Sequence, residues 1–246
     1  MIIGSSTEHH EIVSSTNSVI AGKLKNTPLQ EGYLITASFQ ESGRGQQGNT
    51  WESEAGKNLL MSTIIYPTMV SPEEQFLISQ MASLAVYDLL KNETRHVKIK
   101  WPNDIYVRND KIAGILIENS LIGNSITSSI IGIGLNLNQK SFSDLVPNAV
   151  SLTQITGRVY DVNEISVQLA GMLDSRYRMI RNSESLMLHN DYLLSLYRYH
   201  EWCRYKDDEG EFTGVIEDVR TGGMLIVRRR DGRVKEYSFK EIEYLF

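Results

Sequence analysis

Cysteine is almost absent from this chain of 246 residues, which contains one, Cys203. A single cysteine forms no intrachain disulfide and no cysteine-rich zinc site, and such sparse use is typical of the reducing cytoplasm. The five histidines lack metal-ligand spacing. No apolar run approaches the roughly 20 residues of a membrane span, and the N-terminal residues lack the basic and apolar regions of a signal peptide. We therefore expect a cytoplasmic protein with no membrane partner.

An excess of positive charge is also missing. The formal net charge is −5 at pH 7, from 25 Lys and Arg against 30 Asp and Glu. A protein of this charge has no bulk electrostatic affinity for nucleic acid, so we expect no nucleic-acid partner. The length and the hydrophobic fraction of 41% allow one large domain and a small one.

Apolar spacing predicts an α+β protein in two parts. Strands are expected at residues 11–13, 33–40, 59–66, 105–107, 112–117 and 128–137. Helices are expected at residues 16–26, from the caps at 71–74 through 89, at 162–181 and at 185–199. Short alternating runs at 212–216, 224–227 and 234–239, separated by glycine turns, predict a small all-β module. The expected domains are therefore residues 1–199 and 200–246.

Residues 41–56 contain four glycines and almost no apolar side chain, which predicts a long exposed loop. Its segment 43–48 matches the dinucleotide pattern G-x-G-x-x-G, but the residues after Gly48 lack the apolar face of the helix that a Rossmann site needs. The loop is then a glycine-rich flap that closes over a ligand and carries one cation, Arg44. The alternative is a mobile surface loop without a function; long loops are more often functional.

The most informative stretch is Lys100-Trp101-Pro102-Asn103-Asp104, followed by Lys111. Pro102 excludes a continuing helix, and the apolar runs on either side of residues 108–110 predict a hairpin. This arrangement places two cations and a metal-capable carboxylate on stiff strands. Each residue taken singly also has an ordinary interpretation, as a solvated lysine or a turn aspartate.

Two weaker signals complete the pattern. Ser15, Thr16 and Asn17 stand at a helix start, where they either cap the helix or bind polar groups of a ligand. The segment Gly132-x-Gly134-x-Asn136 ends a strand with small residues. Glycine within a strand indicates close backbone approach, or packing against a neighbouring element.

Taken together, and in this order, the four blocks resemble the biotin protein ligases, the biotin–[acetyl-CoA-carboxylase] ligases. The blocks span residues 15–136, and the small β module also fits. The resemblance implies a catalytic domain akin to class II aminoacyl-tRNA synthetases, a mixed sheet flanked by helices, followed by an SH3-like β-barrel. It implies that biotin and ATP give biotinyl-5′-AMP and pyrophosphate, and that a lysine of the biotin carboxyl carrier domain of a carboxylase then takes the biotinyl group. Mg²⁺ is the implied cofactor.

The resemblance also assigns roles to residues. The implied catalytic residues are Lys111, Arg44 and Asp104, of which Asp104 is also the metal ligand and the group that orients or deprotonates the acceptor lysine. The implied biotin-binding residues are Ser15, Thr16, Asn17, Gln40, Arg44, Gly45, Gln46, Lys111 and Gly114. The implied ATP-binding residues are Arg44, Trp51, Lys100, Asn103, Asp104, Lys111 and Asn136.

The chain departs from the family pattern at the flap, where Gln46 and Gln47 stand in place of arginine. One hypothesis is that loop closure holds the adenylate more than charge does, so that it leaks faster; the alternative is that glutamine hydrogen bonds suffice. Because the first motif begins at residue 15, we also expect no N-terminal DNA-binding domain and no operator binding.

Three rival functions deserve comparison. A lipoate–protein ligase uses the same adenylate chemistry, although the flap and the Lys-Trp-Pro-Asn-Asp block favour biotin. An acyl transferase with a cysteine thioester is disfavoured because Cys203 lies outside every motif. A non-enzymatic binding protein would not need the lysines and Arg44. A homodimer formed through the sheet edge that docks the carrier is compatible with the fold-level analogy.

Overall fold

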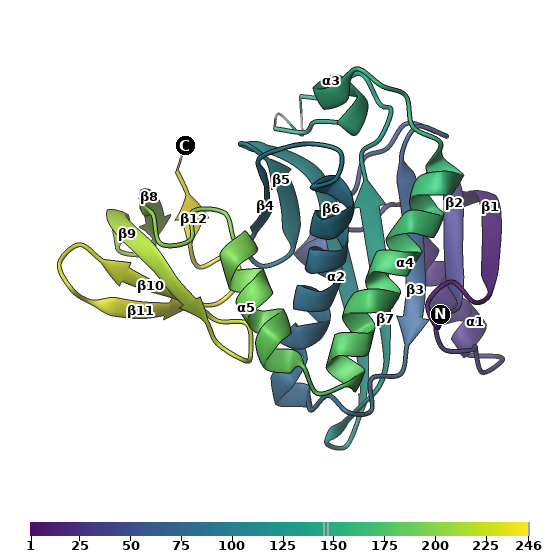
Figure 1. The fold of residues 1–246 in the computed structure, drawn as a ribbon, viewed down its shortest axis with the longest axis horizontal. Helices are drawn as coiled ribbons and strands as arrows, with labels where there is room; N and C mark the ends of the chain where they lie inside the picture. The colour runs from purple at the N-terminus through teal and green to yellow at the C-terminus, as the bar shows by residue number, and fades with distance from the viewer. Residues whose placement is uncertain (145, 147, 246) are drawn as a thin grey trace.

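Two β-sheets organise the chain, and the computed structural model describes every residue except 145, 147 and 246. Figure 1 shows the larger sheet with its helices and the smaller sheet beside it. The strands of the larger sheet are β1 (Thr7–Val13), β2 (Leu34–Gln40), β3 (Leu59–Ile65), β4 (Val97–Lys100), β5 (Asp104–Val107), β6 (Asp110–Ile122) and β7 (Ser125–Leu135). The helices are α1 (Thr16–Leu24), α2 (Phe76–Leu90), α3 (Leu152–Thr156), α4 (Val162–Arg181) and α5 (Ser185–Ser195).

The larger sheet is mixed. Its strand order is β1-β2-β3-β7-β6-β5-β4, with β1 parallel to β2 and every other neighbouring pair antiparallel. This confirms the expected α+β class with a mixed sheet flanked by helices. None of the described helices combines the length and the apolar character needed to cross a lipid bilayer.

The two faces of the larger sheet are covered differently. Helices α2, α4 and α5 pack over one face, in front of the strands in Figure 1, and enclose the main apolar core. On the other face, α1 packs through Ile20 against Ile35, Ile64 and Ile130, over β2, β3 and β7. Side chains alternate between faces along a strand, so positions 114, 116 and 118 of β6 and positions 130, 132 and 134 of β7 lie on the α1 face.

The smaller sheet has the order β11-β10-β9-β8-β12, all antiparallel, as expected for the SH3-like module. Its strands are β8 (Trp202–Asp207), β9 (Gly210–Val219), β10 (Leu225–Arg229), β11 (Val234–Tyr237) and β12 (Glu243–Tyr244). The sequence runs 212–216, 224–227 and 234–239 fall on β9, β10 and β11, whereas β8 and β12 were not predicted. The domain boundary at residues 199–200 stays a prediction.

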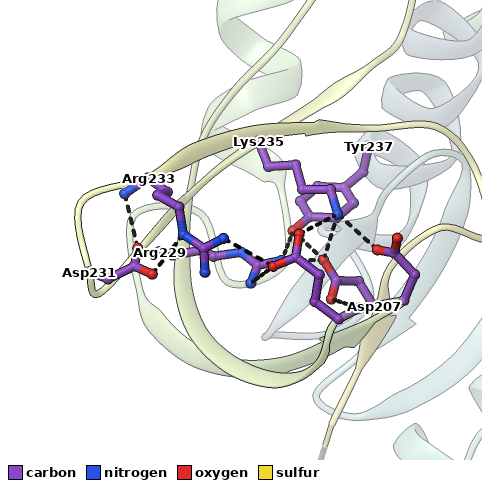
Figure 2. A network of polar contacts seen from close by, with 8 residues as sticks. Asp207, Arg229, Asp231, Arg233, Lys235 and Tyr237 are labelled. Carbon is purple, nitrogen blue, oxygen red and sulfur yellow. Dashed lines mark hydrogen bonds and ion pairs between the residues drawn. The ribbon is translucent and has the colours of Figure 1, made fainter.

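A buried ionic network ties together the strands of the smaller sheet (Figure 2). Arg229 is 5% exposed and pairs with Asp207, whose side chain is fully buried. The hydroxyl of Tyr237 donates to Asp207 at 2.9 Å. The Lys235 ammonium lies 3.2, 2.8 and 3.2 Å from carboxylate oxygens of Asp207, Asp208 and Glu209. This acidic triplet therefore already surrounds a cation supplied by the chain.

Neither β4 nor α3 was predicted, and the element boundaries differ most from the prediction at two helices. Residues 72–74 form a 3₁₀ turn, and α2 begins only at Phe76. The helix predicted at 185–199 ends at Ser195. Leu196 leaves it to bridge with Ile99 of β4, and the Tyr197 N–H donates to the Ile99 carbonyl at 2.8 Å. Pairing with the sheet edge thus replaces the last helical turn.

Candidate functional site

Glycines make the floor of a groove on the α1 face of the larger sheet. Gly114 of β6 pairs with Gly134 of β7, and Leu116 pairs with Gly132. A Cβ atom on Gly134 would lie 2.3 Å from Cε2 of Trp51, and one on Gly132 would lie 2.3 Å from Oδ1 of Asn17. The absence of side chains at these glycines therefore makes room for the Trp51 indole and the Asn17 amide.

The flap, residues 41–56, covers this groove. Within the flap the Gly45 N–H donates to the Asn49 carbonyl at 2.6 Å and the Trp51 N–H donates to the Gly43 carbonyl at 2.9 Å. Residues 46–48 form a 3₁₀ turn. The flap is thus an ordered loop whose Trp51 lies on Gly114 and Gly134, as a ligand-covering loop requires and a structureless surface loop does not.

One end of the groove is a hydrogen-bonded polar cluster. Gln40 Oε1 accepts from the Thr16 N–H at 2.8 Å and from its hydroxyl at 3.0 Å. Ser62 Oγ lies 2.6 Å from both Thr16 Oγ1 and Asn17 Oδ1. Ser15 caps α1 by accepting from the Ser18 N–H at 3.1 Å. Thr16 and Asn17 are buried, so a ligand at this end meets fixed donors and acceptors.

The other end of the groove carries an ion pair. Lys111 Nζ lies 2.7 Å from Asp104 Oδ1 and 5.9 Å from the centre of the Trp51 ring. Both ionic side chains are about one-third exposed, at 34% and 31%. The backbone of Lys111 is fixed as well, because its N–H donates to the Asn148 carbonyl at 2.6 Å and its carbonyl accepts from Val150 at 3.0 Å. A cation and a carboxylate are therefore held at this end before any ligand arrives.

A second cavity continues beyond Trp51 and Lys111. It is lined by Thr50, Trp51, Glu52, Tyr106, Lys111, Asn136, Phe142, Val146, Asn148 and Ala149. In the described part of the chain, three buried polar atoms along the two cavities have no hydrogen-bond partner: Gln46 Oε1, Trp51 Nε1 and Asn136 Oδ1. Buried polar groups in proteins are nearly always paired. Each of these three atoms is therefore available to a ligand bound in the cavities.

Comparison with known proteins identifies the family. Residues 10–136 match the Biotin/lipoate A/B protein ligase family. The Bifunctional ligase/repressor BirA of Bacillus subtilis is 30% identical over 243 residues, covering 96% of this chain and 74% of that protein. The chain belongs to the Biotin/lipoate A/B protein ligase family. Within the family, the Biotin–[acetyl-CoA-carboxylase] ligase of Paracoccus denitrificans is 29% identical over 230 residues, covering 90% of this chain and 95% of that one.

Solved structures of biotin protein ligases share the fold. The enzyme from Aquifex aeolicus in complex with biotin and ATP superposes with a TM-score of 0.79 at 23% identity, covering 97% of this chain and 98% of that one. The enzyme from Leishmania major in complex with biotinyl-5-AMP gives 0.63 at 22% identity, covering 95% and 99%. These likenesses include both sheets, which confirms the catalytic domain and SH3-like module expected of the family.

The structure gathers most residues that the family resemblance implied. Lining the groove are Ser15, Thr16, Asn17, Gln40, Arg44, Gly45, Gln46, Trp51, Asn103, Asp104, Lys111 and Gly114. Asn136 lies in the second cavity with Trp51 and Lys111. Asn103 is buried, and its amide N–H₂ donates to the Ile115 carbonyl at 2.5 Å, which holds the turn before β5 against β6. Its side chain thus acts first as a support for Asp104.

Lys100 is outside the lining of the two cavities. Its ammonium lies 4.9 Å from the ring centre of Tyr106 and 5.1 Å from that of Tyr244, a residue of the smaller sheet. Burial lowers the pKa of Lys100, and the nearby Asp104 carboxylate offsets part of that effect. Lys100 therefore joins the two sheets beside the second cavity, because its ammonium donates to the hydroxyl of Tyr106 at 3.3 Å and Tyr106 lines that cavity. Its role in ATP binding stays a prediction.

The sequence analysis missed several residues in and around the groove, and three of them come from distant segments of the chain. Phe239 reaches it from the smaller sheet, with its ring 6.3 Å from that of Trp101. Ser62 joins the polar cluster from β3. Glu118 of β6 contacts Arg44 across the flap. Two sequence signals could have indicated these residues. Ser62 is a serine in an apolar strand, and Glu118 follows Gly114 by four residues on the same strand face.

Proposed function

We propose that this protein ligates biotin, through biotinyl-5′-AMP, to a lysine of the biotin carboxyl carrier domain of a carboxylase. The relatives named as biotin ligases and the structural neighbours that hold biotin with ATP or biotinyl-5-AMP support this function. The observation that carries it is the two-ended groove: buried hydrogen-bonding groups at one end, and the Lys111–Asp104 pair with a second cavity at the other.

The first step joins a carboxylate to a triphosphate, so like charges must approach each other. A carboxylate oxygen of biotin attacks the α-phosphorus of ATP, the bond to the β-phosphate oxygen breaks, and pyrophosphate leaves. In our proposal Lys111 stabilises the charge at the α-phosphate, and Trp51 separates the biotin cavity from the nucleotide cavity. Preorganised cations at such a centre supply a large share of catalysis.

The polar end is assigned to the ureido ring of biotin. That ring offers N–H donors and one carbonyl acceptor. Gln40, Thr16 and Asn17 together supply both kinds of partner in a buried setting. An analogue lacking the ring would leave these groups unpaired, which is a strong basis for discrimination. A site for lipoate needs no such cluster.

The residues at the nucleotide end fit Mg²⁺. Asp104 supplies one carboxylate, and Asn136 Oδ1 is an unpartnered buried oxygen. Mg²⁺ is commonly held by one or two protein oxygens together with substrate phosphates. When bound, the ion neutralises phosphate charge. Asp104 is the proposed ligand, and Lys111 is the protein's own cation at this end of the groove.

The second step transfers the biotinyl group. The amine of the acceptor lysine attacks the carbonyl carbon of the mixed anhydride, AMP leaves, and the amine loses a proton. Because Lys111 already occupies Asp104 at 2.7 Å, we assign Asp104 to orienting the acceptor amine. Cys203 has no part in this step: it lies on β8, half-buried, and burial raises the pKa of its thiol, which disfavours a thioester.

ATP–pyrophosphate exchange by the purified protein with Mg²⁺ tests the proposal, with biotin and lipoate compared at equal concentration. Exchange with biotin alone supports the function. Exchange with lipoate alone would assign the protein to lipoate ligation, and exchange with neither would leave a binding protein. Transfer is then measured as biotin attached to a carrier domain with its acceptor lysine, against the same domain with that lysine changed to arginine.

A further inference from the structure

Glu118 sits where the flap, α1 and β6 meet. Its carboxylate accepts from both terminal nitrogens of Arg44, with Nη1 2.8 Å from Oε1 and Nη2 2.9 Å from Oε2. Oε2 also accepts from Asn17 Nδ2 at 2.7 Å. One side chain therefore holds a residue of the flap and a residue of the polar cluster on the same carboxylate.

The Arg44 and Glu118 side chains are 44% and 35% exposed, so geometry and not burial distinguishes their contact from an ordinary surface ion pair. Exposed pairs contribute little, but a bidentate arginine–carboxylate pair fixes orientation as well as distance. Asn17 is itself held, since it is 3% exposed, contacts Ser62 and lies over Gly132. The carboxylate of Glu118 consequently has a fixed partner on its inner side, and Arg44 is docked against a rigid point.

The position along β6 separates this contact from the charged end. Glu118 and Gly114 share a strand face and are four residues apart, which corresponds to about 13 Å of strand. Lys111 lies near Gly114, because a Cβ there would be 3.4 Å from its Nζ. Arg44 is thus directed toward the polar end of the groove, and its charge is balanced by Glu118 in the ligand-free protein.

We infer that Glu118 is a positioning residue for the biotin site: by seating Arg44 and Asn17 together, it holds the tip of the flap over the polar end of the groove. The inference rests on the proposed function for the identity of the ligand. The flap contact itself is a property of the free protein, so the two are tested separately.

The first experiment needs no ligand. Glu118→Gln keeps the size and an acceptor for Asn17 but removes the charge that holds Arg44. We expect tryptic cleavage after Arg44 and deuterium uptake in the flap to rise about fivefold, as for the loss of roughly 1 kcal/mol. Glu211→Gln is the matched control, because it removes a carboxylate from the exposed pair with Arg204 on the smaller sheet.

The second experiment measures biotin and ATP binding by calorimetry, each alone. We expect Glu118→Gln to weaken biotin about fivefold, to leave ATP affinity unchanged, and to leave the unfolding temperature close to that of Glu211→Gln. Glu118→Asp, which restores the charge with a shorter reach, is expected to recover part of the biotin affinity.

Glu118→Gln would overturn the inference if tryptic cleavage and deuterium uptake in its flap were unchanged. An equal loss of ATP and biotin affinity would also overturn it. Failure of the wild-type protein to bind biotin would instead refute the proposed function. In that case the ligand-free comparison still decides whether Glu118 seats the flap.

Discussion

Gly134→Ala tests whether the glycine floor exists to admit Trp51. The added Cβ would lie 2.3 Å from Cε2 of Trp51 and 2.7 Å from both Cζ2 and Nε1. The indole must therefore move, because Gly134 is on β7 in the middle of the sheet and the atoms that it meets are those of a rigid ring. Overpacking of this kind costs roughly 1–3 kcal/mol.

The strain is expected to be relieved by departure of Trp51 from the groove. The population with Trp51 in place, and with it the apparent affinity for ATP and biotin, then falls about 5-fold to 150-fold. Calorimetric titration gives the affinities. Tryptophan fluorescence follows the move of the indole, with Trp51→Phe assigning the signal to that residue.

Gly171→Ala is the matched control, because it adds the same methyl group in α4 with no atom within 4 Å of it beyond its own helix, among the described residues. It should leave ligand affinity unchanged and stabilise the helix by about 0.5–1 kcal/mol. If Gly134→Ala binds both ligands like the wild type and keeps its fluorescence, the account of the glycine floor is wrong.

Three further changes have defined outcomes. Lys111→Met should reduce biotin-dependent ATP–pyrophosphate exchange about 10²–10³-fold, and exchange near the wild-type rate would remove Lys111 from the reaction. Arg229→Met leaves the Asp207 charge buried and should lower the unfolding free energy in urea by roughly 3–5 kcal/mol; a change under about 1 kcal/mol would show that the network is redundant. Burial acts to raise the pKa of Asp207, but the polar contacts of Figure 2 lower it by more. The stabilisation by the ionised Asp207 is therefore complete above about pH 4, and it is lost as the pH falls through the lowered pKa. Urea titrations at pH 3 to 6 check this, since Arg229→Met should make the unfolding free energy depend less on pH. Gln46→Arg should slow the release of preformed adenylate chased by unlabelled biotin. Release at the wild-type rate would indicate that the hydrogen bonds of glutamine suffice.

Local signals predicted much of the fold. The helix expected at residues 162–181 is α4 with the same bounds, because Asp161 caps its first turn by accepting from Asn163 and Glu164. The motif order also predicted which segments line the groove, from Ser15 to Gly114. The helix depends on neighbours in the chain, which propensity and spacing describe directly, whereas the groove segments followed from the family resemblance.

Contacts between distant residues could not be predicted in this way. Arg44 was expected to contact biotin and ATP, and its pairing with a carboxylate 74 residues away was not predicted. Lys100 was expected to bind ATP, but its packing between tyrosines of the two sheets was not predicted. Side-chain direction at the end of a strand depends on which element packs against it, and no periodic pattern records that choice.

The position of Lys100 joins the smaller sheet to the strands that carry the site. Its ammonium lies between Tyr106 of β5 and Tyr244 of β12, while Trp101 beside it donates to the Gly223 carbonyl at 2.9 Å. A protein truncated after residue 199 would lose Tyr244 from beside Lys100 and the carbonyl that accepts from the Trp101 indole. It would also lose Phe239 from the groove. The C-terminal module therefore supplies one side of the groove, and its removal would change the site as well as the fold.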